Sequence, residues 1–198
     1  ATTEIYTLSL HDALPICGLT MTMERGYSGV VFLGQHSKAG TRNGIMAHSY
    51  SSLGIQNIRL NGKPVGETET RTMLAGAFNV PVILLTGDVA AVNEMKALVP
   101  EAETAAVKEG LARYTCISMS APEARNAIRA AARRAAAKIG KVQPYKVSGP
   151  VTIEVEYTTR NSLRIDADKA LGGEIVDDRT IRYTGKDFLE AWTKARMW

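Results

Sequence analysis

Short apolar runs alternate with segments of helical periodicity along most of this chain. The apolar or alternating runs predict β-strands at Val30–Leu33, Ile55–Leu60, Pro81–Thr86, Thr104–Val107, Tyr114–Met119, Val151–Tyr157 and near Thr180–Tyr183. Helical periodicity predicts α-helices over Glu67–Phe78, Val89–Leu98, Ser120 to about Ile139, Asn161–Ala170 and Asp187–Met197. Such an alternation is typical of α/β proteins. The sequence therefore predicts an α/β fold in which a mixed sheet is flanked by helices.

Turn and capping signals separate these elements. Asn61-Gly62 is a strong hairpin signal and predicts a return strand over Lys63–Gly66. Asp88 suits the N-cap of the helix that follows it, and a catalytic role for this residue is the weaker alternative. Ser120, with a glutamate three residues later, has the pattern of a capping box. Residues 140–150 contain two prolines and two glycines and form the best linker candidate.

Composition and charge exclude several classes of protein. At 198 residues, 45% of them hydrophobic and 22% charged, the chain has the composition of a single globular domain. No apolar run approaches the roughly 20 residues that span a bilayer, so we expect no membrane partner. The formal net charge is +4, and the most basic predicted helix has no aromatic residue, so we expect no nucleic-acid partner. Cys116 is the only cysteine outside the first seventeen residues, which favours a reducing cytoplasm.

Two histidines and one glutamate carry the candidate chemistry. His36 ends an apolar run, His48 closes a short segment predicted to be extended (Ile45–His48), and Glu67 follows a strand and opens a helix. Strand ends and helix starts are where α/β proteins gather functional side chains. Neutral imidazole with carboxylate is a zinc-type ligand set, and zinc sites use three or four protein ligands. The set therefore indicates a zinc site that is incomplete.

Each of these residues also has a purely structural interpretation. His36 could bond to the backbone at a strand end, and His48 could be a half-buried structural histidine. Glu67 could simply favour the helix N-terminus, where a carboxylate gains about 0.3–1 kcal/mol. Helical geometry should point Glu69 away from the direction of Glu67. The loop cations Lys38 and Arg42 could face a substrate or water, and we expect them to face water.

Four motifs follow one another in an order that carries a family resemblance. They are Gly-Val-Val-Phe-Leu-Gly-Gln-His ending at His36, Gly-Ile-Met-Ala-His-Ser around His48, Ile-Arg-Leu-Asn-Gly-Lys-Pro-Val-Gly-Glu ending at Glu67, and Val-Pro-Val-Ile-Leu-Leu-Thr-Gly-Asp ending at Asp88. Together they resemble the dizinc D-aminopeptidases of the bacterial dipeptide-transport operon. The likeness extends over residues 21–198.

The resemblance implies roles for three residues. It implies that His36 and Glu67 bind zinc, that His48 is the catalytic residue, and that an intact family member holds two zinc ions per subunit. We expect His48 to act as an acid/base or to stabilise the oxyanion, because zinc already makes water a strong nucleophile near neutral pH. The implied substrates are short peptides that begin with a D-residue, such as D-alanyl-D-alanine. The implied partner is the protein itself, assembled into rings.

The family also has an N-terminal Asp-x-Glu-Gly strand end and a further histidine, and neither has a counterpart here. The first sixteen residues suggest why, because Tyr6–Ile16 is the in-frame translation of a common short-read sequencing adapter. We expect residues 1–17 to be an artefactual segment joined to a family member that lacks its N-terminal strands, which removes His11 and Asp12 from consideration. We expect residues 18–143 to form an α/β metallopeptidase core fragment, and residues 144–198 a C-terminal α/β portion of the same catalytic unit.

Two functions remain open at this stage. The first is a fragment of a zinc-dependent D-aminopeptidase that is inactive as written, because His36 and Glu67 alone would hold zinc poorly. The second is a non-catalytic module, either for oligomerisation or, less favoured, for binding an acidic partner through its basic charge.

Overall fold

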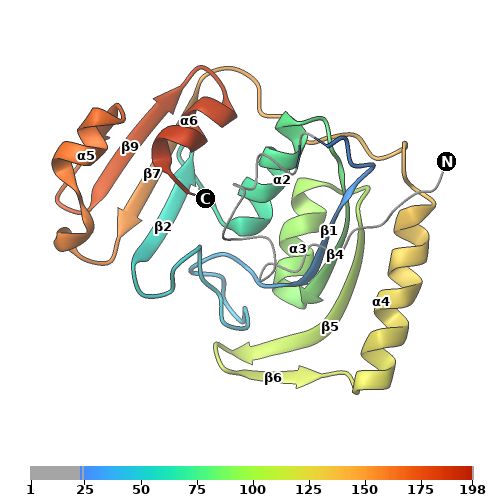
Figure 1. Ribbon diagram of the computed structural model, residues 1–198. Coiled ribbons are helices and arrows are strands. Elements are labelled where there is room, and N and C mark those ends of the chain that lie inside the picture. The colour runs from blue at the N-terminus through green and yellow to red at the C-terminus, as the bar shows by residue number, and fades with distance from the viewer. Residues whose placement is uncertain (1–22, 24, 198) are drawn as a thin grey trace.

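The computed structural model describes Met23 and residues 25–197, and these residues form two β-sheets with helices between and around them (Figure 1). The predicted α/β fold with flanking helices is confirmed. The sequence predicts one mixed sheet, whereas the described residues form a four-stranded mixed sheet and a five-stranded antiparallel sheet. The expectations for residues 1–17 lie outside the described residues.

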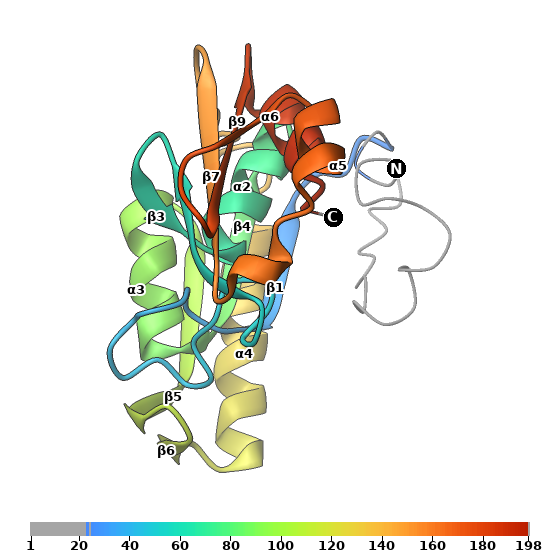
Figure 2. The ribbon, with the colours of Figure 1, turned by 90° about the vertical axis from the view of Figure 1, so that its left-hand side faces the viewer.

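The first sheet has the strand order β1-β4-β5-β6. Its strands are β1 (Val30–Gln35), β4 (Val82–Asp88), β5 (Glu103–Ala112) and β6 (Thr115–Ser118). The first three are parallel, and β6 is the antiparallel partner of β5. All seven residues of β4 are buried, because helices cover this central strand on both faces. The helices α3 (Val89–Leu98) and α4 (Ala121–Ala136) lie on either side of β5 (Figure 2).

Both predicted helix caps of this layer are confirmed. The side chain of Asp88 accepts a hydrogen bond from the backbone of Ala91 and so caps α3. Ser120 and Glu123 form a reciprocal capping box at the start of α4. These side chains satisfy backbone N–H groups that have no partner within the helix.

The second sheet is antiparallel throughout and has the order β3-β2-β7-β9-β8. Its strands are β2 (Ile55–Leu60), β3 (Lys63–Val65), β7 (Val151–Tyr157), β8 (Gly173–Ile175) and β9 (Thr180–Gly185). Along β7, buried positions alternate with half-buried ones, as expected for a strand with one covered face. The β2–β3 hairpin therefore lies in the same sheet as the three strands that follow residue 144, although it comes far earlier in the sequence.

Three helical segments accompany the second sheet and another lies between the sheets. The short η1 (Arg160–Ser162) and α5 (Ile165–Ala170) precede β8, and α6 (Phe188–Ala195) packs on β7 and β9. Figure 1 shows α2 (Glu67–Ala77) between the two sheets. Within α2, Met73 and Leu74 belong to the core of the second sheet, and Ala75 belongs to the core of the first. Because α2 contacts both cores, its first residue is held where the two sheets meet.

Several predicted elements differ from the structure. Ile45–His48 is not extended but forms a turn, and Met46 has a left-handed φ of 51°. The predicted polar link after Val107 is part of a hairpin, because β5 runs on to Ala112. The helix predicted over Asn161–Ala170 is divided into η1 and α5. The short strand β8 was not predicted, since three residues carry too little periodicity to detect.

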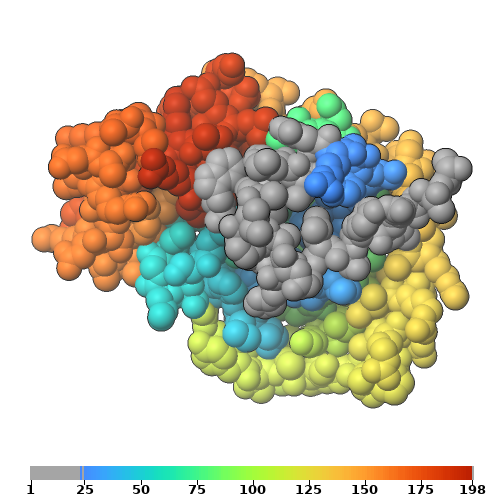
Figure 3. All heavy atoms as spheres, in the orientation of Figure 1, coloured from blue at the N-terminus to red at the C-terminus, as the bar shows by residue number. Residues whose placement is uncertain are grey.

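The two sheets give the molecule two sides. The second sheet and its helices form one side, and the β5–β6 hairpin with α4 forms the other (Figure 3). No helix in the described part of the chain is both long enough and apolar enough to cross a membrane.

Candidate metal centre

His36, His48 and Glu67 converge on one point between the sheets. His36 follows the end of β1, His48 lies in the loop from β1 to β2, and Glu67 is the first residue of α2. The Nε2 atom of His36 lies 3.6 Å from Oε1 of Glu67, and Nε2 of His48 lies 3.9 Å from the same oxygen. One donor atom from each residue lies within 4.8 Å of those of the other two. The structure therefore brings together all three residues that the sequence singled out, and their roles remain predictions.

The backbone fixes the orientation of both imidazoles. Nδ1 of His36 lies 3.0 Å from the carbonyl oxygen of Ser37, and Nδ1 of His48 lies 2.7 Å from that of Met46. A carbonyl oxygen only accepts hydrogen bonds, so each Nδ1 carries the hydrogen. The lone pair of each ring is then on Nε2, the atom that faces Glu67. His36 is thus bonded to the backbone, as its structural interpretation proposed, and still presents a free ligand atom.

The loop that carries both histidines, residues 36–50, is called the site loop below. The carbonyl oxygen of Ser37 also accepts a hydrogen bond from the backbone N–H of His48 at 3.3 Å. This bond closes the site loop on itself, and the two imidazole rings stack with centroids 3.9 Å apart and planes inclined by 20°. The stacking places both Nε2 atoms beside each other, so that both face the carboxylate of Glu67.

Glu67 is the most buried member of the set, with 5% of its surface exposed. Its Oε1 accepts a hydrogen bond of 2.8 Å from the backbone N–H of Tyr50. Its Oε2 is buried and has no hydrogen-bond partner within the described ranges. A buried carboxylate oxygen without a partner is costly unless a cation or a donor satisfies it. The donor set of two imidazole nitrogens and one carboxylate fits zinc, and the unpartnered oxygen fits a cation beside it.

Tyr50 supports Glu67 and was not identified from the sequence. Its hydroxyl lies 2.7 Å from that of Thr70, and its ring centroid lies 5.7 Å from that of Trp192. Burial raises the pKa of Tyr50 to about 12, so its hydroxyl stays neutral. Its φ of 60° is left-handed, a conformation that non-glycine residues adopt when contacts enforce it. Only the packing against α2 and α6 shows this role, so the sequence offers no signal for it.

Lys38 is paired rather than facing water, contrary to the expectation from the sequence. Its Nζ lies 2.9 Å from Glu94 on α3 and 3.2 Å from Glu69 on α2. Burial alone would lower the pKa of Lys38, but the hydrogen bond to Glu94 and the charges of both carboxylates outweigh it and raise that pKa. Thr41 donates a further hydrogen bond of 2.8 Å to Glu94. The site loop is thereby attached to both helices that carry these carboxylates.

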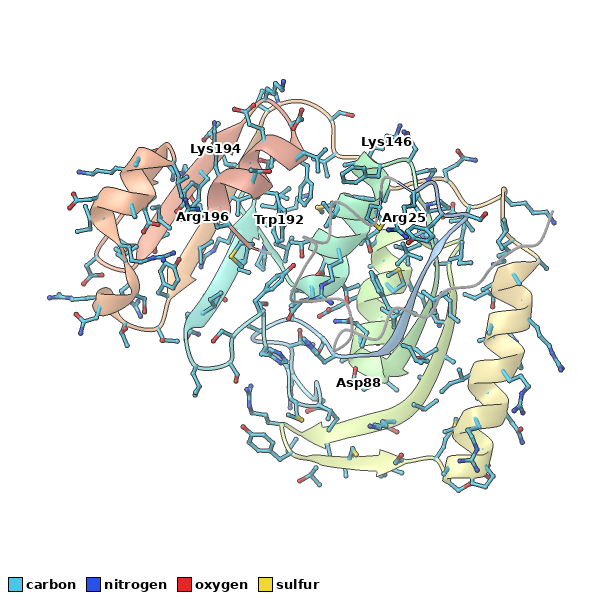
Figure 4. The ribbon with its side chains drawn as sticks, viewed as in Figure 1. Arg25, Asp88, Lys146, Trp192, Lys194 and Arg196 are labelled. Atoms are coloured by element: carbon cyan, nitrogen blue, oxygen red, sulfur yellow. The ribbon has the colours of Figure 1, made fainter. Side chains whose placement is uncertain are left out.

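The remaining candidates behave as expected. Glu69 points away from the histidine cluster, and its Oε2 accepts a 2.8 Å hydrogen bond from the backbone N–H of Gly66. Asp88 lies at the start of α3 (Figure 4), where its second oxygen accepts a 2.7 Å bond from the backbone N–H of Ile45 in the site loop. Asp88 therefore caps a helix and anchors the site loop, and it does not belong to the cluster.

We expect Lys38→Met to lower the free energy of unfolding by about 1–3 kcal/mol, because the change leaves two partly buried carboxylates without their shared cation. Arg160→Met is the matched control, since Arg160 pairs with Asp178 at 2.7 Å but 78% of its side chain is exposed. An exposed pair contributes about 0–1 kcal/mol. Urea denaturation of both variants measures the difference. Equal losses would show that Lys38 contributes no more than a surface ion pair.

Known proteins resemble this chain over most of its length. The family described as D-aminopeptidase matches residues 16–197. A D-aminopeptidase of Bacillus subtilis (strain 168) is 30% identical over 167 residues, which are 84% of this chain and 60% of that protein. The solved structure described as "Zn-dependent D-aminopeptidase DppA from Bacillus subtilis, a self-compartmentalizing protease" matches with a TM-score of 0.75 and 28% identity, over 86% of this chain and 61% of that one. The chain thus spans about 60% of the length of these relatives. With its family match running from residue 16 to residue 197, this chain belongs to the D-aminopeptidase family.

Proposed function

We propose that His36, His48 and Glu67 form part of the zinc site of an aminopeptidase that hydrolyses short peptides beginning with a D-residue, such as D-alanyl-D-alanine. The observation that carries this proposal is the buried Glu67, which faces two imidazole Nε2 atoms and has one oxygen without a partner among the described residues. The name of the Bacillus subtilis relatives supports the substrate class.

His36 and Glu67 would hold the metal in this proposal. When bound, zinc supplies a Lewis acid that polarises the scissile carbonyl and lowers the pKa of a water molecule. The 2.8 Å bond from the N–H of Tyr50 fixes Oε1 of Glu67, and the bond from Nδ1 of His36 to Ser37 fixes that imidazole. Both outer partners orient their ligand, and the carbonyl that accepts the Nδ1 hydrogen also raises the basicity of the His36 imidazole.

His48 would serve as the acid/base. Its Nδ1 hydrogen is held by the carbonyl oxygen of Met46, so Nε2 would accept a proton from the attacking water and donate it to the amine that leaves as the C–N bond breaks. The imidazolium formed in between would be stabilised by the carboxylate of Glu67, whose Oε1 lies 3.9 Å from that nitrogen. The same ring also has the position to hydrogen-bond an oxyanion.

The described ligand set is too small for two zinc ions, and we propose that further ligands come from a strand beside β1. Within the described residues, β1 lies at an edge of the first sheet. An edge strand leaves backbone N–H and C=O groups open to another strand, and Val31 and Leu33 of β1 are also 39% and 63% exposed on one face. A parallel strand at that edge would end next to His36. We therefore propose that chain 1–198 by itself binds zinc weakly and hydrolyses little substrate.

We further propose that copies of the protein associate into a closed ring that admits only small peptides. The description of the structural relative as self-compartmentalizing supports this. The β5–β6 hairpin offers a suitable surface, because Leu111, Tyr114 and Ile117 are 53%, 78% and 62% exposed. The same surface favours the alternative function, a non-catalytic oligomerisation module.

Cys116 on this hairpin is a free, exposed thiol, which fits the reducing cytoplasm expected from the sequence.

Zinc titration and peptide hydrolysis test the proposal together. We expect chain 1–198 to bind zinc weakly, as measured in competition with a low-affinity chelating dye, to lose this binding in His36→Ala, and to release little alanine from D-alanyl-D-alanine. The Bacillus subtilis relative is the positive control for hydrolysis, and L-alanyl-L-alanine tests stereochemical preference. Equal binding in His36→Ala would refute the metal site. Rapid hydrolysis by chain 1–198 would support the proposed D-aminopeptidase activity, but it would refute the proposal that this chain alone hydrolyses little substrate.

A further inference from the structure

The turn of the β5–β6 hairpin lies against the site loop immediately before His48. Figure 1 shows this turn beneath the connection from β1 to β2. Arg113, which follows β5 directly, donates a 2.6 Å hydrogen bond from Nη1 to the carbonyl oxygen of Ala47. The carbonyl oxygen of Arg113 accepts a 2.8 Å bond from the backbone N–H of Met46. One residue of the hairpin thus holds both residues that precede His48.

These bonds continue to the imidazole of His48. The peptide group before Met46 is held by Arg113, and the carbonyl oxygen of Met46 accepts the Nδ1 hydrogen of His48 at 2.7 Å. The bond from Arg113 to Ala47 fixes the peptide that links Ala47 to His48, so the intervening peptide, which carries the Met46 carbonyl, is held from both sides. If these two peptides rotate, the acceptor for Nδ1 moves and the ring loses its fixed tautomer.

The local backbone needs such a restraint. Met46 has a φ of 51°, which costs a non-glycine residue about 1 kcal/mol or more. Asn43, three residues earlier, has a φ of 58°, and the carbonyl oxygen of Asn43 lies so close to Gly110 of β5 that a Cβ on Gly110 would clash with it. The hairpin and the site loop are therefore in direct backbone contact, and the hairpin enforces the left-handed turn.

Arg113 is itself held in place on the hairpin. Its Nε donates a 3.0 Å hydrogen bond to the hydroxyl of Tyr114, and its guanidinium carbon lies 5.5 Å from the centroid of that ring. The guanidinium is therefore pre-oriented toward the site loop before the bond to Ala47 forms. A flexible cation without this support would lose more entropy in making the same bond.

We propose that Arg113 is a positioning residue for His48. It holds the Met46 and Ala47 peptides so that His48 keeps its hydrogen on Nδ1 and presents Nε2 toward Glu67. The consequence for catalysis rests on the proposed function, whereas the effect of Arg113 on the ring does not. The β5–β6 hairpin, distant in sequence from every candidate ligand, thereby becomes part of the site.

The tautomer of His48 in the metal-free protein tests this inference. Long-range ¹H–¹⁵N correlation spectra of the histidine rings, recorded above the pKa of free imidazole, distinguish Nδ1–H from Nε2–H. We expect His48 of the unmodified chain to show the Nδ1–H pattern. Arg113→Met should shift its tautomer ratio roughly fivefold toward Nε2–H, the population change that the loss of one net hydrogen bond produces. Arg113→Lys, which keeps a donor of similar reach, should restore most of the original pattern.

The structure supplies two controls for this experiment. His36 bonds to Ser37 and not to the hairpin, so its tautomer should stay unchanged in Arg113→Met. Arg129→Met removes another exposed arginine, which contacts Asn126 on α4, and should leave both rings unchanged. An unchanged His48 in Arg113→Met would overturn the inference, and so would an equal change at His36, which would indicate general loosening. If the unmodified chain binds no zinc, the proposed function fails, yet these spectra still decide the role of Arg113.

Discussion

Glu67→Gln will remove most of the affinity for zinc while leaving the fold intact. The amide has the shape of the carboxylate, and its oxygen can still accept the 2.8 Å bond from the N–H of Tyr50. It lacks the negative charge that both Nε2 atoms face at 3.6 and 3.9 Å. We expect zinc affinity to fall roughly 100-fold or more, beyond the 10–100-fold typical of outer partners of a ligand. Titration against a chelating dye measures this loss.

The same substitution should have the opposite effect on the metal-free protein. Oε2 of Glu67 is buried without a partner in the described residues, so the ionised carboxylate destabilises the fold in the absence of a cation. In the presence of EDTA we expect Glu67→Gln to melt at a temperature equal to or above that of the unmodified chain. Added zinc should raise the melting temperature of the unmodified chain, because a ligand of the folded state stabilises it, and should leave the variant unchanged.

Glu69→Gln is the matched control for Glu67→Gln. It is the same chemical change two residues further along α2, at a carboxylate that bonds to Gly66 and Lys38 instead of facing the histidines. We expect this variant to bind zinc as the unmodified chain does and to be less stable, since it weakens a capping box and an ion pair. If Glu67→Gln and Glu69→Gln were to bind zinc equally well, the metal centre would have to lie elsewhere.

Two of the three candidate residues, His36 and Glu67, could be placed from the sequence because they occupy positions that local patterns define. An apolar run marks the end of β1 before His36, and the hairpin signal at Asn61-Gly62 with the following helical periodicity marks the start of α2 at Glu67. Such signals depend on a few neighbouring residues, so they survive without knowledge of the fold. Strand end and helix start then predict a common edge, and the structure places both residues there.

The parts of the site that escaped prediction all depend on contacts between distant segments. The turn at Met46 forms because the backbone of Arg113, 67 positions later, accepts its N–H. Lys38 is paired because α2 and α3 bring two carboxylates to it. The division into two sheets arises because β2 pairs with β7, about a hundred residues away. No local propensity encodes these pairings, and tertiary contacts override local preference where the two conflict.

Trp192→Ala will have the largest effect on stability. Trp192 lies on α6 and is 2% exposed, and Figure 4 shows its side chain on the side of the helix that faces α2. Its ring stacks on Phe188 at 5.5 Å and meets Tyr50 at 5.7 Å between centroids. Removing a buried aromatic ring costs about 3–5 kcal/mol of unfolding free energy, because the neighbours cannot fill the cavity. Urea denaturation, followed by far-ultraviolet circular dichroism, measures the loss.

The contact with Tyr50 gives this substitution a second, more specific consequence. Trp192 supports the residue whose N–H holds Glu67, so the cavity should loosen the carboxylate as well as the core. We expect the zinc affinity of Trp192→Ala to fall about 10-fold under conditions where the variant is still folded, as is typical when an outer partner is disturbed. Leu189→Ala, on the same helix but only half-buried, is the control, and should cost about 1 kcal/mol without changing zinc affinity. If the tryptophan variant lost stability but bound zinc as tightly as the leucine variant, the second sheet would support the fold alone and Tyr50 would hold Glu67 without help from α6.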